Sequence, residues 1–159
     1  NDKQITTFLV ISTVFAMFGS WLIGGLVKYK GTVYSYWIVL WLWLIALGLI
    51  MASSGQLLFW AVGPLAGMGM GGVWVVSRTI IVELAPPEKI GEFFGIYGLA
   101  GKMASIAGPL IWGTVVWMLE DTQTLKYRAA VGSLLLITVI TIILFNKLQK
   151  QIPKHSTVG

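Results

Sequence analysis

One lysine stands in the middle of an apolar stretch of small residues, Gly95 to Pro109, which reads GIYGLAGKMASIAGP. Lys102 is the only charged residue of this stretch, and no acidic residue lies nearer in the sequence than Glu92. An ammonium group can pair with a carboxylate, bind an anionic group of a small molecule, or change its protonation state in a wet cavity. Which of these applies depends on the solvent in which the stretch lies.

The composition indicates that this solvent is a lipid bilayer. Of the 159 residues, 57% are hydrophobic and 11% are charged, whereas soluble domains carry about 25% charged residues. The net charge of +5 does not indicate nucleic-acid binding, because the basic residues are scattered over loops and the tail. We therefore predict an integral membrane protein that contacts lipid and binds no nucleic acid.

Five apolar segments are long enough to cross, as helices, a bilayer core about 30 Å thick. The segments are joined by short loops, and no linker or charge block divides the chain. We therefore expect residues 1–159 to form a single all-α transmembrane domain in which neighbouring helices are antiparallel. The predicted spans are about 5–27, 36–52, 57–84, 93–119 and 129–145.

Loop charges predict the orientation, since cytoplasmic loops carry an excess of Lys and Arg. Six lysines follow the first, third and fifth spans, and three basic residues lie on the opposite side. This places the N-terminus outside and the C-terminus in the cytoplasm. An odd number of spans in this orientation, with a first residue other than Met, predicts a piece of a longer chain. The six are Lys28, Lys30, Lys89, Lys147, Lys150 and Lys154, and the three are Lys3, Lys126 and Arg128.

The spans differ in the size of their side chains. The second and fifth are bulky and apolar on all sides, which is typical of helices that face lipid. The third and fourth carry small residues at four-residue spacing, which clears one side of a helix for the close approach of another. We therefore expect these two spans to be buried or to line a path. The small residues are Gly63, Gly67 and Gly71 in the third span, and Gly91, Gly95, Ala100, Gly101, Ala104 and Ser105 in the fourth.

Charged residues gather around the Pro86-Pro87 turn between the third and fourth spans. Ser77 and Arg78 lie about two turns inside the third span, Glu83 lies nearer its end, and Glu92 opens the fourth span. One interpretation is an interfacial cluster that holds two helix ends together. Another is a gate whose contacts break and re-form between two conformations.

Lys102 lies about 15 Å along the fourth span at about 1.5 Å per residue, close to the bilayer midplane. Charged residues at that depth usually face a cavity or a paired charge, and the chain has no Asp or Glu there. The partner is therefore a carboxylate on other polypeptide, an anionic group of a substrate, or water in a cavity. The alternative is a shifted span that leaves Lys102 shallower. Gly108-Pro109 follows and permits a kink.

Other chemistry finds little support in the sequence. Gly67 to Gly72 formally matches the G-x-G-x-x-G pattern, but it lies within an apolar span and not after a strand, so helix packing explains it better than a nucleotide. The single histidine, His155, lies in a polar tail, and the chain has no cysteine. We predict no metal site, no cofactor and no enzymatic activity.

A long ordered motif resembles a known family. Residues 67–113 contain, in order, a glycine-rich helix, a Ser-Arg pair, a Pro-Pro turn, Glu-Phe-Phe-Gly-x-Tyr, a Gly-Lys pair and a Gly-Pro pair. This order closely resembles the Vacuole Effluxer-like branch of the major facilitator superfamily. Gly24 to Gly31 is also similar to the superfamily's cytoplasmic loop motif, although Lys28 and Tyr29 stand where that motif has Asp and Arg.

The resemblance implies that the five spans are helices 8–12 of a twelve-helix secondary transporter whose N-terminal half is missing from this sequence. It implies transport of a small-molecule substrate by alternating access, with amino-acid efflux as the activity associated with fungal members. We expect a prokaryotic inner membrane as the location. The alternative is a non-transporting membrane scaffold or assembly subunit. The expected path residues are Gly101, Lys102, Ser105, Gly108 and Pro109, and the expected cytoplasmic gate is Ser77, Arg78, Glu83 and Glu92.

Overall fold

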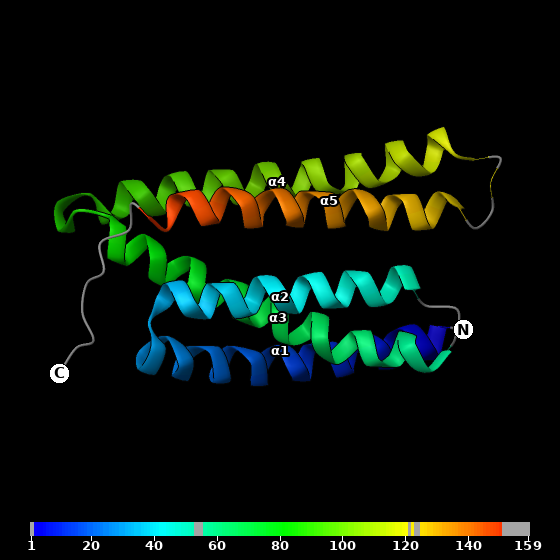
Figure 1. Cartoon of the computed structure of the whole chain (residues 1–159), viewed down its shortest axis with the longest axis horizontal. Helices are drawn as coiled ribbons and strands as arrows, with labels where there is room; N and C mark the ends of the chain where they lie inside the picture. The colour runs from blue at the N-terminus through cyan, green and yellow to red at the C-terminus, as the bar shows by residue number, and fades with distance from the viewer. Residues whose placement is uncertain (1, 53–55, 121, 123–124, 151–159) are drawn as a thin grey trace.

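The computed structural model describes residues 2–52, 56–120, 122 and 125–150. Within these residues the chain forms five long α-helices and one short 3-10 helix, arranged as a bundle (Figure 1). Each α-helix is long and apolar enough to cross a membrane, so the prediction of an all-α membrane fold is confirmed. The helices are α1 (Asp2–Lys30), α2 (Thr32–Ala52), α3 (Gln56–Leu84), η1 (Pro87–Lys89), α4 (Ile90–Met118) and α5 (Leu125–Leu148).

Most helix ends extend past the predicted spans, because a helix continues beyond the hydrocarbon core until the backbone turns. Between α1 and α2 the turn is a single residue, Gly31, whose φ of 84° is a conformation that favours glycine. Its N–H donates to the carbonyl of Val27 at 3.0 Å, and its own carbonyl accepts from the N–H of Ser35 at 3.2 Å. The helix-to-helix reversal is therefore completed almost without a loop.

Small residues bring α1 and α3 together. A Cβ atom built on Gly67 would lie 2.2 Å from the backbone oxygen of Ser12, and one on Gly71 would lie 2.0 Å from that of Ala16. At Gly63 the nearest atoms are side-chain atoms of Phe8 and Ser12, at 3.0 and 3.1 Å. The glycine repeat of the third span therefore faces the backbone of α1.

The second helix lies in the interior of the bundle, between α3 and α5 (Figure 1). The expectation that it faces lipid is therefore wrong for much of its surface. Bulky apolar side chains pack on neighbouring helices as readily as on lipid, so their size alone does not distinguish the two surroundings. Its buried residues are Thr32, Ser35, Val39, Leu40, Ala46 and Leu47.

The fourth helix lies at the edge of the bundle, beside α5 (Figure 1). It contains no buried residue, and a Cβ atom built on any of its glycines would meet nothing within 4 Å. The expectation that this span is buried is therefore wrong for the described chain, because its small residues permit a close neighbour without supplying one. The other expectation, that it lines a path, stays a prediction.

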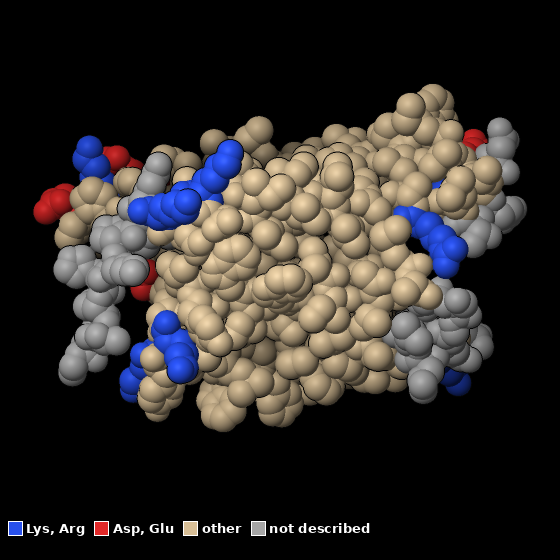
Figure 2. Space-filling model, in the orientation of Figure 1, with Lys and Arg blue, Asp and Glu red and all other residues tan. Residues whose placement is uncertain are grey.

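Charged side chains lie at the two ends of the bundle in the view of Figure 2, with an uncharged belt between them. One end carries the ends of α1, α3 and α5 with Lys28, Lys30, Lys89, Lys147 and Lys150, and we name it the basic end. The opposite end carries Lys3, Lys126 and Arg128. The belt is the surface that a bilayer core would cover.

Candidate functional site: the Lys102 face of α4 and the basic end

Lys102 lies inside α4, about 18 Å from the start of the helix at about 1.5 Å per residue. It is exposed, and the described residues place no carboxylate beside its ammonium group. Its apolar neighbours are exposed as well: Leu99 and Ile106, three and four residues away on the same side of α4, and the adjacent Met103 each expose 61–65% of their surface. A lysine at the centre of a membrane-spanning helix costs about 2.5–3.5 kcal/mol on insertion scales, so this position is unfavourable unless something covers or solvates it.

The residues around Lys102 form one face of α4. Successive members are separated by four, three, four, three and four residues, which is the recurrence of a helix with 3.6 residues per turn. All of them are exposed. We call this surface the Lys102 face; its members are Gly91, Gly95, Gly98, Lys102, Ser105 and Pro109, and Leu99 and Ile106 flank it on one side.

Of the other expected path residues, Ser105 and Pro109 belong to this face, and Gly101 and Gly108 do not. Ser105 donates its hydroxyl hydrogen to the carbonyl of Lys102 at 2.7 Å, so its side chain bonds within the helix. Pro109 lies inside α4 and has no N–H to offer the carbonyl four residues earlier. Gly101 and Gly108 lie beside the face, with nothing within 4 Å of their Cβ positions. The five residues thus share a helix, and no other element contributes to a pocket around Lys102 in the described chain.

The expected gate residues lie at the basic end but form no ion pair with one another in the described chain. The carboxylate of Glu83 accepts a hydrogen bond from the hydroxyl of Thr32 at the start of α2. Arg78 places its guanidinium carbon 5.1 Å from the ring centre of Trp74, one turn earlier on α3. Glu92 is exposed. The interpretation of a charge cluster is therefore wrong for this conformation, because Glu83 and Arg78 contact uncharged side chains and do not contact one another.

Ser77 connects α3 to α4. Its hydroxyl lies 2.6 Å from the carbonyl oxygen of Val73 and 2.9 Å from the hydroxyl oxygen of Tyr97. A serine hydroxyl carries one hydrogen, which goes to Val73, so Tyr97 donates to Ser77. The bond joins two helices that touch over only a short length near the turn.

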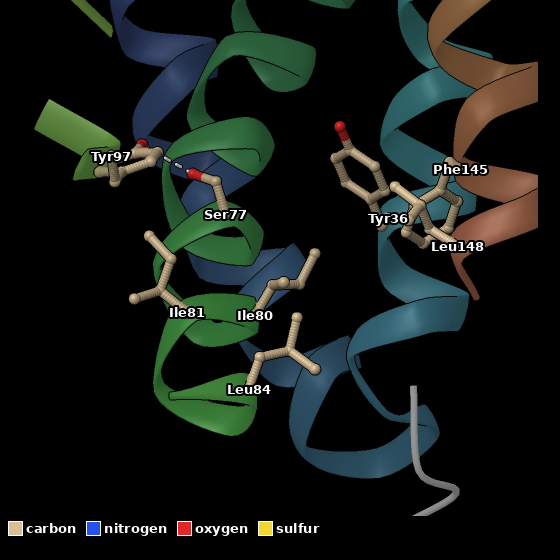
Figure 3. Close-up of a pocket in the computed structure, with 8 residues that line it drawn as sticks. All are labelled: Tyr36, Ser77, Ile80, Ile81, Leu84, Tyr97, Phe145 and Leu148. Carbon is tan, nitrogen blue, oxygen red and sulfur yellow. Dashed lines mark hydrogen bonds between the residues drawn. The ribbon is translucent and has the colours of Figure 1, made fainter. Parts of the chain in front are cut away.

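This bond lies on the wall of a cavity of about 480 Å³ between α3 and α5. Figure 3 shows Tyr97 and the α3 side chains on one wall, with Tyr36 and the α5 side chains on the other. Three of its lining residues carry hydroxyl groups, and the other five are apolar. The lining residues are Tyr36, Ser77, Ile80, Ile81, Leu84, Tyr97, Phe145 and Leu148.

Aromatic contacts close the α2–α5 side of this cavity. The ring of Phe145 lies edge-on to Tyr36, with ring centres 4.4 Å apart, and also contacts Trp37 at 5.7 Å. The indole N–H of Trp37 donates to the side-chain oxygen of Gln149 at 2.7 Å. Sequence reasoning missed these residues and Thr32. Only Tyr97 carried a usable signal, because it belongs to the ordered motif of the fourth span.

A family model described as the Major Facilitator Superfamily matches residues 2–157. The chain belongs to the Major Facilitator Superfamily. It is a membrane protein of a transporter family, and the expected family is confirmed.

The chain is also similar to individual curated proteins. The chain is 35% identical over 86 residues to "Uncharacterized MFS-type transporter YxiO" of Bacillus subtilis, covering 54% of this chain and 19% of the relative. It is 33% identical over 85 residues to "Autophagy-related protein 22" of Eremothecium gossypii, covering 54% of this chain and 16% of the relative. It is also 30% identical over 74 residues to "Multidrug resistance protein 3" of Bacillus subtilis, covering 46% and 14%. The matched segments thus span less than a fifth of these relatives' length. No solved structure matches the chain.

Proposed function

We propose that this chain is part of a secondary active transporter that moves a small solute by alternating access, and that α4 borders the transport path. The observation that carries the proposal is the Lys102 face, a cationic surface halfway along an apolar helix of a superfamily transporter. Amino acids are the first substrates to test, since the sequence resembles the Vacuole Effluxer-like branch. The proposed position of the five helices is that of helices 8–12 in a twelve-helix fold.

The basic end is the proposed cytoplasmic gate. Alternating access requires contacts that hold one conformation and are given up in the other. The Tyr97–Ser77 and Thr32–Glu83 hydrogen bonds suit this role, because each joins two helices through a single pair of side chains. Arg78 and Glu92 lie at the same end and are available to a partner in the other conformation. The proposed location is a prokaryotic inner membrane with this end in the cytoplasm.

The test is transport by the full-length protein that contains this chain, reconstituted in liposomes with labelled amino acids. The Lys102→Met variant is expected to lose about tenfold or more in initial rate, equivalent to about 1.4 kcal/mol or more of lost interaction. Lys126→Met is the matched control, because Lys126 lies at the opposite end of the bundle, over the ring of Tyr127 at 5.4 Å. A Lys102→Met protein that inserts in normal amount and transports at the wild-type rate would refute the role of Lys102 in the path.

A further inference from the structure

Lys102 occupies the centre of a helix face that nothing in the described chain covers. A cation within a membrane span is retained when it pairs with a carboxylate or faces water. Second copies of this chain cannot provide the carboxylate, since its six acidic residues all lie at or beyond helix ends. The nearest along α4 is Glu92, about 15 Å away at about 1.5 Å per residue. Any carboxylate at the depth of Lys102 must therefore come from other polypeptide or from a bound solute.

The shape of the face distinguishes these two sources. On the basic-end side of Lys102 the face consists of Gly91, Gly95 and Gly98, and the apolar side chain of Leu99 flanks it. These residues present no polar side chain with which to recognise a solute. The same chain shows what such a face does elsewhere. On α3 the repeat of Gly67 and Gly71 lies directly on the backbone of α1, at a distance that no Cβ atom would fit. A glycine face thus accommodates the backbone of a neighbouring helix. A helix packed on the Lys102 face must in addition carry a negative charge near Lys102.

We propose that Lys102 forms an ion pair with an Asp or Glu carboxylate on a further transmembrane helix, which packs against the Lys102 face of α4. This inference rests on the proposed function, because it treats the chain as part of a larger transporter. The partner helix carries its carboxylate near the middle of its span. It also has small residues about one to three turns towards the basic end, where the three glycines of α4 permit close approach.

A double-substitution scan in the full-length transporter identifies the carboxylate. Each intramembrane Asp or Glu outside this chain is replaced by Asn or Gln, alone and together with Lys102→Met, and the amount of monodisperse protein after mild heating is measured. Removing one partner of a buried pair leaves an unpaired charge, so each single variant is expected to lower the folded amount about tenfold. For one carboxylate, the double variant is expected to recover most of that loss.

A steric pair of variants tests the helix contact separately from the charge. Gly98→Leu places a large side chain on the Lys102 face and is expected to lower the folded amount strongly. Ala100→Leu is the matched control, because Ala100 lies two residues away on the other side of α4 and is also exposed. Equal tolerance of both leucines would overturn the inference.

The outcomes separate this inference from the proposed function. If no carboxylate shows recovery while Lys102→Met still abolishes transport, the ion pair is refuted and a solute-binding lysine in the path is supported. If one carboxylate recovers folding and the double variant transports normally, the ion pair holds and the path role of Lys102 fails. If Lys102→Met changes neither folded amount nor transport, both are refuted.

Discussion

The contact between α1 and α3 can be tested by adding one methyl group. At Gly71 a Cβ atom would lie 2.0 Å from the backbone oxygen of Ala16, whereas real Cβ atoms essentially never come within 3.0 Å of another heavy atom. Gly71→Ala therefore requires α1 to retreat by about 1 Å or more. Because the obstacle is backbone, no side-chain rotation relieves it.

The cost follows from two opposing terms. Overpacking of this kind costs about 1–3 kcal/mol, and a backbone obstacle favours the upper end. Alanine in place of glycine inside a helix returns about 1 kcal/mol. The net loss for Gly71→Ala is therefore about 2 kcal/mol, which corresponds to a fall in Tm of about 4–8 °C for a chain of this size.

The assay is the thermal unfolding of the purified protein in detergent, followed by tryptophan fluorescence, since the chain has eight tryptophans. Gly25→Ala and Gly48→Ala are matched controls, because a Cβ atom at either glycine meets nothing within 4 Å. Both should leave the Tm unchanged or raise it. A Gly71→Ala protein as stable as these controls would show that α1 and α3 do not approach as closely as described.

Three further predictions concern the basic end and the orientation. Tyr97→Phe and Ser77→Ala should each lower the unfolding free energy by about 0.6–1.5 kcal/mol, with the double variant no worse than either single one, as a double-mutant cycle would measure. Trp37→Phe keeps an aromatic ring but removes the indole N–H that bonds to α5, and it should lower the Tm by about 2–4 °C for a loss of about 1 kcal/mol. Because the chain has no cysteine, single cysteines report its orientation: an impermeant maleimide added to intact cells should label Thr122→Cys and spare Glu88→Cys, and the reverse result would invert the predicted topology.

The helices were predictable from the sequence because membrane insertion depends on a local quantity, the apolar length of each segment. The helix boundaries were less predictable, since helices continue beyond the hydrocarbon core. Only Gly31 separates α1 from α2, for example. The lysine-rich ends of the first, third and fifth spans also lie together as expected from antiparallel neighbours.

The packing partners of each helix were not predictable, because they lie far apart in the sequence. Gly67 and Gly95 belong to similar four-residue repeats, yet only the first meets a neighbouring backbone within 4 Å. The hydrogen bonds Thr32–Glu83 and Ser77–Tyr97 join residues 51 and 20 positions apart. Serine, threonine and tyrosine are too common in such a chain to indicate their partners, so these contacts required the structure.

The contrast between α3 and α4 bears on how such a transporter could move. Inside a bilayer, apolar side chains gain little by leaving lipid for protein, so helices associate through close packing and polar contacts. On α3 the glycines Gly67 and Gly71 lie directly against the backbone of α1. Such a close contact resists separation. The Lys102 face also carries glycines, but no neighbouring helix lies within 4 Å of their Cβ positions in the described chain. In the proposed transporter a further helix packed there would slide along the glycines, and the proposed ion pair at Lys102 would fix its register in one conformation. A helix that exchanges between two positions needs a surface with few side chains along which it can move, and one polar contact that holds it in one of the positions.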